Sequence, residues 1–284
     1  YALRSARQWG MGDFTDLRHL VESMALLGAA FVGLNPLHAL FPENPDAASP
    51  YSPSSRSALN VLYIDVEAAP EFADCEAAQR LVRDAAFHER LRALRERDEV
   101  DYAGVAALKL PVLGALYECF RERHLLRDTH RARAFRQFQR GRGATLRAHA
   151  VFAAIQARLQ AEDPALWGWP AWPEPWRDPE GETVRRFVQE HPEAVEYQEY
   201  LQWLADEQLQ AVRERAESLG MAIGLYRDLA VGSSEGGSDT WSAPSLYALG
   251  TRVGAPPDAL NPAGQDWGLP PWQPQALRER AYKP

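Results

Sequence analysis

Two short apolar runs, far apart in the sequence, constrain the fold most. Residues 29–34 (Ala-Ala-Phe-Val-Gly-Leu) and 221–226 (Met-Ala-Ile-Gly-Leu-Tyr) carry no charged side chain. Runs of this length and composition are typical of strands that are buried on both faces of a parallel sheet. Each run follows a stretch with helical spacing that ends at a glycine, Gly28 or Gly220. A helix followed by a buried strand indicates a parallel α/β unit.

Composition divides the 284 residues into three predicted parts. Residues 1–73 are predicted to form strand, helix and loop, and Gly12-Asp13 provides the start signal of the helix. Residues 74–219 are rich in Ala, Arg, Glu, Leu and Gln with repeated helical spacing, which predicts an insertion of four or more helices. Residues 220–284 hold the next strand and a loop rich in Gly, Pro, Ser and Trp, and α/β barrels build their sites on such loops. We therefore predict an α/β fold that is the N-terminal part of a (β/α)8 TIM barrel, with about three barrel strands and a large, mostly helical insertion.

Bulk properties exclude several classes of partner. The formal net charge is -8, and arginines are interspersed with acidic residues, which disfavours nucleic acid. No uninterrupted apolar run approaches the roughly 18 residues of a membrane span, so we expect no membrane partner. Cys75 and Cys119 are distant in sequence and lack metal-ligand spacing, which predicts neither a disulfide framework nor a zinc site and favours a cytoplasmic protein. The chain opens without methionine and stops abruptly at residues 282–284, so we expect both ends to be cuts through a longer protein.

Polar side chains follow the first apolar run at its carboxyl end. Asn35 and His38 suit a neutral, hydroxyl-rich ligand, although a lone histidine among apolar neighbours is more often a satisfied structural residue. Downstream, prolines stiffen the loop that carries Ser49 and Tyr51. This loop can present a ring and hydroxyls to a carbohydrate, or it can be a rigid connection.

The second apolar run is followed by Asp228, whose carboxylate can accept sugar hydroxyls or pair with the adjacent Arg227. Further on, Asp258, Gln265 and Trp267 lie among turn residues, as expected of an aromatic binding loop. Residues 167–176 contain four tryptophans and three prolines, which predicts a structural loop that pins helices in preference to a sugar platform.

Taken in order, these segments resemble the amylomaltase family of 4-α-glucanotransferases over essentially the whole chain. The matching segments are residues 10–14, 35–38, 49–51, 60–65, 226–232, 256–258 and 264–268. The resemblance implies a retaining double displacement on α-1,4-glucans, in which the 4-hydroxyl of an acceptor glucan resolves the glycosyl-enzyme. It also implies that the substrate subsites are lined by Ser49, Tyr51, Asp228, Gln265 and Trp267, with Asn35, His38 and Asp258 in support.

The chain departs from the family pattern in one important respect. The family's nucleophilic Asp belongs to an Arg-Ile-Asp-His type segment, and no such segment is found before Pro284. The family's acid/base Glu and third Asp come later still and are also not found before Pro284. We therefore expect no catalytic residue in this chain and an inactive isolated fragment. A smaller departure is residues 269–272, Leu-Pro-Pro-Trp, where some relatives carry Asn-Pro-Leu-Tyr.

Three function classes stay open from the sequence. The first is a glucanotransferase acting on maltooligosaccharides, the second an α-glucan hydrolase of the amylase kind, and the third a non-catalytic glucan-binding protein. No ligand cluster or phosphate-cradling loop occurs, so we expect neither a metal nor an organic cofactor. The sequence leaves the oligomeric state undetermined.

Overall fold

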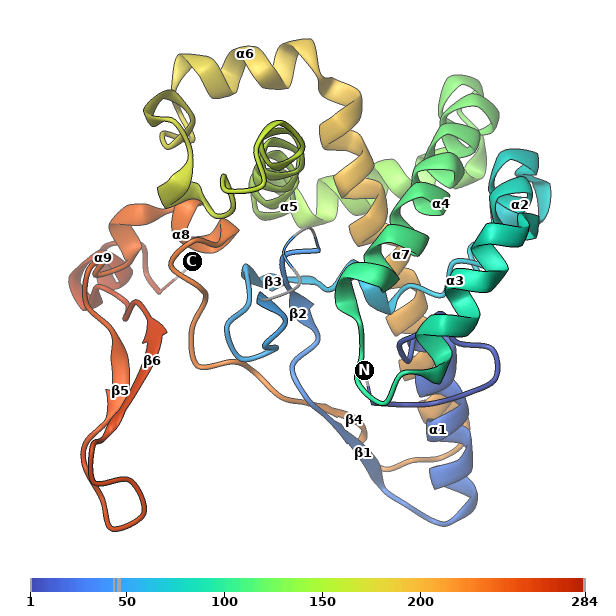
Figure 1. Cartoon of the computed structure of the whole chain (residues 1–284), viewed down its shortest axis with the longest axis horizontal. Coiled ribbons are helices and arrows are strands. Elements are labelled where there is room, and N and C mark those ends of the chain that lie inside the picture. Colours follow the sequence, from blue (N-terminus) through green and yellow to red (C-terminus); the bar gives the residue numbers. More distant parts are fainter. Residues whose placement is uncertain (1, 43, 45–46, 283–284) are drawn as a thin grey trace.

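The computed structural model describes residues 2–42, 44 and 47–282 and shows a mixed α/β chain dominated by helices (Figure 1). The longer helices in the described part are α1 (Phe14–Leu26), α2 (Glu76–Arg83), α3 (Ala85–Glu96), α4 (Tyr102–Arg123), α5 (His130–Glu162), α6 (Glu182–Glu190) and α7 (Pro192–Ser218). Two short helices, α8 (Ser238–Ser242) and α9 (Pro274–Glu279), lie near the end of the chain. The strands are β1 (Phe31–Leu34), β2 (His38–Ala39), β3 (Ser55–Leu59), β4 (Gly224–Arg227), β5 (Val253–Ala255) and β6 (Gln265–Leu269).

Helix α1 begins and ends close to the predicted signals. Asp13 is its N-cap and accepts hydrogen bonds from the backbone N–H groups of Thr15 and Asp16, which satisfies two of the unpaired donors of the first turn. Gly28 follows the helix in a left-handed conformation with φ of 80°. The strand that the sequence predicts before this helix is absent from residues 2–13, which form bends and irregular structure. This part of the prediction is wrong.

The region between β3 and β4 is largely helical, as its composition predicts. Helices α2 to α7 occupy it, with α5 and α7 in extensive contact. The first two helices of this region are separate, because Asp84 ends α2 and caps α3 by accepting from the N–H groups of Ala86 and Phe87. Helix α5 is interrupted at Gly143, whose φ of 56° and ψ of -137° are not helical. That residues 74–219 form a separate subdomain stays a prediction.

The strands form three two-stranded sheets. β1 and β4 are parallel, with Phe31 opposite Gly224 and Leu34 opposite Arg227. The pairs β2–β3 and β5–β6 are antiparallel. The described residues therefore contain one parallel pair in place of the three successive strands that the sequence predicts. The α/β class is confirmed.

The β1–β4 pair is covered on one face only. Val32 and Leu225 pack on the main core, which α1 and α7 also line. Phe31 and Tyr226 lie on the other face, 48% and 64% exposed, with ring centroids 5.9 Å apart. The prediction that both strands are buried on both faces is wrong for this chain, because no described element covers that second face.

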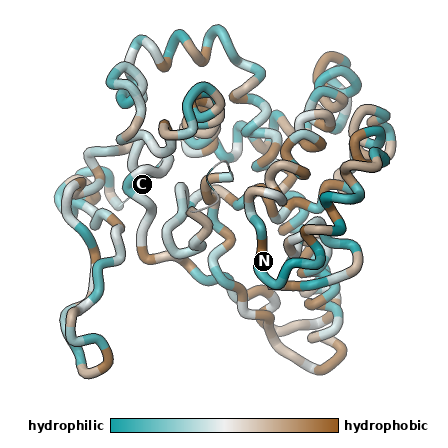
Figure 2. Tube along the Cα trace, in the orientation of Figure 1, coloured by the Kyte–Doolittle hydropathy of each residue, from teal (hydrophilic) through white to brown (hydrophobic). Residues whose placement is uncertain are grey.

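Exposed hydrophobic side chains continue from this open face. Figure 2 shows a hydrophobic turn between α1 and β1 at the lower edge of the molecule, and Leu26 and Leu27 there are among the most exposed apolar residues. Ile223, Leu229 and Val231 are also exposed before and after β4. The open face is defined here by the exposed rings of Phe31 and Tyr226.

The tryptophan-rich segment is mainly structural, as the sequence favours. Trp172 is fully buried in a second core cluster, stacked on Phe152 and in edge contact with Trp241. Its indole N–H donates to Gln156 Oε1 at 3.3 Å. The segment therefore pins the 228–247 region against α5.

A buried lysine joins the helical part to the start of the chain. Lys109 of α4 is buried, and its ammonium donates to the carbonyls of Leu62 and Ile64 at 2.6 and 2.8 Å. Burial lowers the pKa of Lys109 to about 8, against the opposing attraction of Asp13 and Asp65. At neutral pH the group is therefore still mainly protonated. Arg7 binds the same two carboxylates.

Two further features concern the cysteines and the apolar helix α4. Cys75 and Cys119 form a disulfide with their Cα atoms 5.9 Å apart, because Cys75 precedes α2 and that helix packs on α4. The prediction that these cysteines support no disulfide is therefore wrong. Residues 102–127, which include α4, are long and apolar enough to cross a membrane by length and composition, and half of the relevant window is buried. Val105, Leu113 and Leu116 of α4 are fully buried in the main core, as expected of a core helix.

Candidate functional site

The parallel pairing of β1 and β4 brings two predicted site residues to one edge. Asn35 and Asp228 each follow directly on a strand, and the Asp228 N–H donates to the carbonyl of Leu34 at 3.1 Å. Both side chains are exposed. The carboxyl ends of parallel strands are where ligand-binding residues of α/β proteins gather. We call Asn35 and Asp228 the strand-end site.

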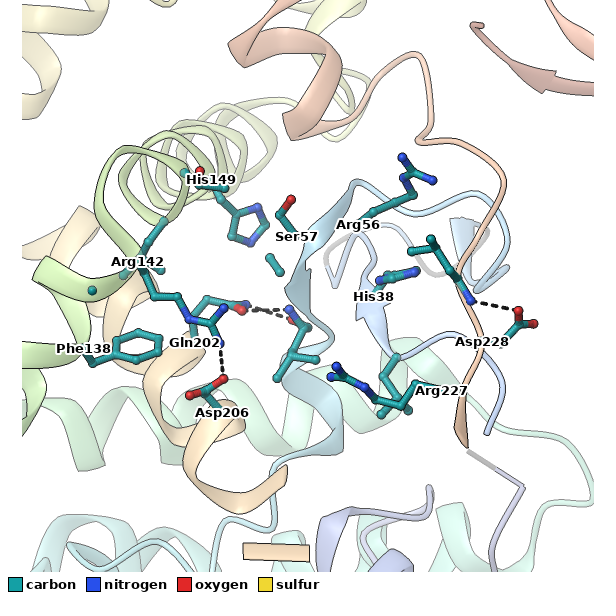
Figure 3. A pocket seen from close by; sticks show the side chains of 17 residues that line it. His38, Arg56, Ser57, Phe138, Arg142, His149, Gln202, Asp206, Arg227 and Asp228 are labelled. Atoms are coloured by element: carbon teal, nitrogen blue, oxygen red, sulfur yellow. Dashed lines mark hydrogen bonds and ion pairs between the residues drawn. The ribbon is translucent and has the colours of Figure 1, made fainter. Parts of the chain in front are cut away.

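The Asp228 carboxylate points away from its neighbour Arg227. Figure 3 shows Arg227 directed into a pocket and Asp228 directed to the opposite side, as expected for successive residues at the end of a strand. Asp228 Oδ1 accepts from the Leu229 N–H at 2.8 Å. No Arg227–Asp228 ion pair is found between these two described residues. The structure therefore gives no support to the ion-pair interpretation, and the carboxylate retains acceptor capacity for hydroxyl groups.

A polar pocket of about 650 Å³ adjoins the strand-end site (Figure 3). Its walls come from the β2–β3 pair, the interrupted part of α5, the middle of α7 and the end of β4. The labelled lining residues are His38, Arg56, Ser57, Phe138, Arg142, His149, Gln202, Asp206, Arg227 and Asp228. Arg142 pairs with Asp206, and Gln202 exchanges two hydrogen bonds with the backbone of Leu59. The pocket is therefore polar, and several of its polar side chains are held in place by partners within the protein.

His38 is half-buried and has a structural partner. Its Nε2 accepts a hydrogen bond from the Ala230 N–H at 3.3 Å, so the proton of the neutral ring lies on Nδ1. Burial, followed by repulsion from Arg56, lowers the pKa of His38 below its ordinary value. The geometry favours the structural interpretation of this histidine, and its predicted substrate contact stays a prediction.

His149 of α5 is a second neutral histidine in the pocket. It is buried, and its Nδ1 lies 3.0 Å from Ser238 Oγ. Desolvation lowers the pKa of His149 to about 4. Figure 3 shows the ring extending from α5 toward Ser57. This histidine attaches the interrupted helix to the region that follows Asp228.

The low pKa of His149 predicts a loss of stability in mild acid. Between about pH 6.5 and pH 4 the unfolded chain takes up a proton that the folded chain does not, so the free energy of unfolding falls as the pH is lowered. A shift of this size corresponds to about 3 kcal/mol. We expect the His149→Gln protein to lose less stability than the wild type between pH 7.5 and pH 4.5, as measured by urea unfolding. Replacing the exposed His88 by Gln is the matched control, and equal acid sensitivity of all three proteins would contradict the assignment.

The Ser49–Tyr51 loop is attached to the same region by its backbone. Tyr51 is 48% exposed, and its N–H donates to Ser49 Oγ at 3.4 Å. Two residues later the carbonyl of Pro53 accepts from the Ser234 N–H at 2.7 Å. The exposed ring is consistent with a binding role, and the loop lies beside the segment that follows Asp228.

The remaining predicted residues lie on or next to the β5–β6 hairpin, which projects from the body of the molecule in Figure 1. Trp267 is 41% exposed, and its indole N–H donates to Gln265 Oε1 at 3.0 Å. Asp258 accepts from the N–H groups of Leu260 and Asn261 and so stabilises the turn of the hairpin. In Figure 1 this hairpin lies apart from the ends of β1 and β4. The convergence of all the predicted residues at one site stays a prediction.

Arg56 is a residue that the sequence analysis did not single out. Its guanidinium donates to the carbonyls of Ala230 and Val231 and lies 5.5 Å from the ring centroid of Trp272. The signal that could have found it is a lone arginine among the serines and prolines of residues 49–57, the last of which belong to β3. Within the described residues no group of three or more His, Cys, Asp or Glu side chains is arranged to hold a metal ion.

Comparison with known proteins gives a consistent result. A family model described as 4-alpha-glucanotransferase matches residues 1–284. The chain is 40% identical over 288 residues to a 4-alpha-glucanotransferase of Haemophilus influenzae and 37% identical over 294 residues to one of Mycobacterium tuberculosis. All of this chain is aligned in both cases, but it spans only 41% and 38% of those relatives.

Solved structures agree with the sequence relatives. The crystal structure of amylomaltase from Corynebacterium glutamicum matches 99% of this chain and 36% of its own, with a TM-score of 0.80 and 37% identity. Amylomaltase from Streptococcus agalactiae in complex with acarbose matches all of this chain and 54% of its own, with a TM-score of 0.75, and at 21% identity it supports the fold alone. The full-length match to the family model, together with these relatives, shows that the chain belongs to the 4-alpha-glucanotransferase family.

Proposed function

We propose that the protein containing this chain transfers α-1,4-glucan segments from a donor maltooligosaccharide to the 4-hydroxyl of an acceptor glucan or glucose. The observation that carries the proposal is the match of the whole chain to the 4-alpha-glucanotransferase family. The exposed carboxylate and amide of the strand-end site suit hydroxyl-rich ligands. The proposed reaction is a retaining double displacement.

We further propose that β1 and β4 belong to a (β/α)8 barrel whose other strands come from the rest of the longer protein. The open face is apolar, and a barrel interior is filled by such side chains. Residues 1–73 and 220–284 would then supply barrel strands and substrate loops, and residues 74–219 the helical insertion. In this proposal the chain contributes substrate-binding residues only: Ser49, Tyr51, Asp228, Gln265 and Trp267, supported by Asn35, His38 and Asp258.

The reaction requires no metal or organic cofactor in this proposal, because two carboxylates suffice for retaining transfer. A cytoplasmic location also remains a proposal, and the pairing of Cys75 with Cys119 removes one argument for it.

Maltotriose distinguishes transfer from hydrolysis in the full-length protein. Transfer produces glucose and oligosaccharides longer than maltotriose while the total number of reducing ends stays constant. Hydrolysis raises the number of reducing ends, and a glucan-binding protein without catalysis changes neither quantity. If the number of new reducing ends equals the number of glucose molecules first released, the protein is a hydrolase and the proposed function is wrong.

Trp267 provides a residue-level prediction within this assay. Replacing it by Ala in the full-length protein is expected to lower kcat/KM for maltotriose at least about fivefold, equal to about 1 kcal/mol, because an exposed indole can stack on a sugar ring. Its exposure predicts a nearly unchanged melting temperature. The buried Trp172 is the contrasting control, since its replacement by Ala should cost about 3 to 5 kcal/mol of stability. A large drop in melting temperature with unaltered kinetics for Trp267→Ala would assign this residue a structural role.

A further inference from the structure

We propose that Arg56 is a positioning residue that fixes the segment after Asp228 and couples it to the other predicted substrate loops. The inference deepens the proposed function, because it concerns how the strand-end site is held in place. It depends on the contacts of the Ala230 peptide and on the position of Arg56 between three segments that are distant in sequence.

The Ala230 backbone is held from both sides. Its N–H donates to His38 Nε2 at 3.3 Å, and its carbonyl accepts from Arg56 Nη1 at 2.8 Å. The same guanidinium nitrogen lies 3.3 Å from the carbonyl of Val231. Ala230 is fully buried, whereas Leu229 and Val231 on either side of it are mostly exposed. Ala230 is therefore the anchor of this segment, and it lies two residues after Asp228.

Asp228 is fixed on its other side by the sheet. Its N–H donates to the carbonyl of Leu34 in the β1–β4 pair. The backbone between this bond and the Ala230 peptide is only two residues long. A short segment held at both ends has few accessible backbone conformations, so the direction of the Asp228 side chain depends on both attachments.

Arg56 is itself held rigidly at its backbone. Its N–H donates to Asp239 Oδ2 at 2.9 Å, and Ser233 Oγ donates to the same oxygen at 2.6 Å. Close packing adds to this attachment, because a Cβ atom on Gly237 would lie 2.4 Å from the carbonyl oxygen of Ser54. Arg56 can therefore transmit the position of β3 to the Asp228 segment.

The guanidinium also contacts the base of the hairpin. Arg56 Cζ lies 5.5 Å from the ring centroid of Trp272, which stacks on Tyr247 at 4.5 Å. Trp272 follows β6, which carries Gln265 and Trp267. Arg56 thus follows the Ser49–Tyr51 loop in sequence, bonds to the segment after Asp228 and contacts the residue after the hairpin. A lysine cannot reproduce this arrangement fully, because it lacks the planar group that donates and stacks at once.

The test compares Arg56→Met, Arg56→Lys and the matched control Arg90→Met in the full-length protein. Arg90 is an exposed arginine of α3. We expect Arg56→Met to raise KM for maltotriose at least about tenfold and Arg56→Lys to recover part of the loss. Loss of folded protein alone lowers apparent kcat and leaves KM unchanged, so unchanged KM would overturn the proposal.

A double-mutant comparison shows whether Arg56 acts through Asp228. If it does, Arg56→Met combined with Asp228→Asn should be no more impaired than Asp228→Asn alone. Fold-losses that multiply in the double mutant would overturn this coupling.

Hydrogen exchange of the Ala230 amide tests the attachment without any assay of activity. We expect its protection to fall at least about tenfold in Arg56→Met and to stay unchanged in Arg90→Met. Unchanged protection in Arg56→Met would overturn the proposal even if activity falls. If the wild type does not disproportionate maltotriose, the proposed function fails, and the exchange measurement still decides whether Arg56 holds this segment.

Discussion

Residues 1–284 expressed alone are expected to transfer no glucosyl units from maltotriose. Retaining transfer needs a nucleophilic carboxylate and an acid/base group about 5 to 5.5 Å from it. Asp228 is the carboxylate that the described structure places at the strand-end site, and the resemblance predicts that it binds substrate. One such group cannot serve as both nucleophile and acid/base. The measurement is maltotriose disproportionation by this segment and by the full-length protein, assayed side by side.

The physical state of the segment must be controlled in the same experiment. Its open face and the unpaired edges of β1 and β4 invite association, so we expect a poorly soluble or aggregated product. Circular dichroism and size-exclusion chromatography identify any folded, monomeric fraction, which is the fraction to assay. Robust turnover by that fraction would show that the nucleophile lies within residues 1–284.

Replacing Lys109 by methionine is expected to lower the free energy of unfolding by about 3 to 5 kcal/mol. Methionine fills a similar volume but donates no hydrogen bond, so the carbonyls of Leu62 and Ile64 lose their buried donor. Asp13 and Asp65 also lose a neighbouring positive charge, although Arg7 still binds both. The midpoint of urea unfolding of the full-length protein measures the effect.

Arg123→Met is the matched control for Lys109→Met. Arg123 lies on the same helix, is exposed, and should tolerate the change within about 0.5 kcal/mol. A loss below about 1 kcal/mol for Lys109→Met would show that the buried ammonium costs nearly as much to desolvate as its hydrogen bonds return.

The sequence predicts the local elements well where a local cause determines them. Helix α1 begins at the capping carboxylate of Asp13 and ends before Gly28, and both signals are readable without a structure. The apolar runs at Phe31 and Gly224 also become strands. Their solvent exposure could not be predicted, because it depends on which other strands are present and not on the runs themselves.

The sequence does not reveal properties that depend on contacts between residues distant in sequence. Trp172 and Trp267 are alike as residues, but one is buried against Phe152 and the other is exposed on a hairpin. Cys75 and Cys119 become neighbours only because α2 packs on α4. Arg56 acquires its partners from residues more than 170 positions later. For the same reason, the position of the hairpin relative to the strand-end site could not be predicted from the sequence.

The pairing of β1 with β4 has a consequence for biosynthesis. The paired residues Phe31 and Gly224 are about 190 residues apart, so at about 5 to 20 residues per second β1 leaves the ribosome roughly 10 to 40 s before its partner strand. The helices between them consist largely of local contacts and can fold within that interval. During the same interval the apolar β1 strand has no partner and is a target for chaperones or for neighbouring nascent chains. Early folding of the helical segment therefore shortens the time for which β1 is unpaired. Helix α7 packs on α1, so the chain that leads into β4 is already beside β1 when β4 is made.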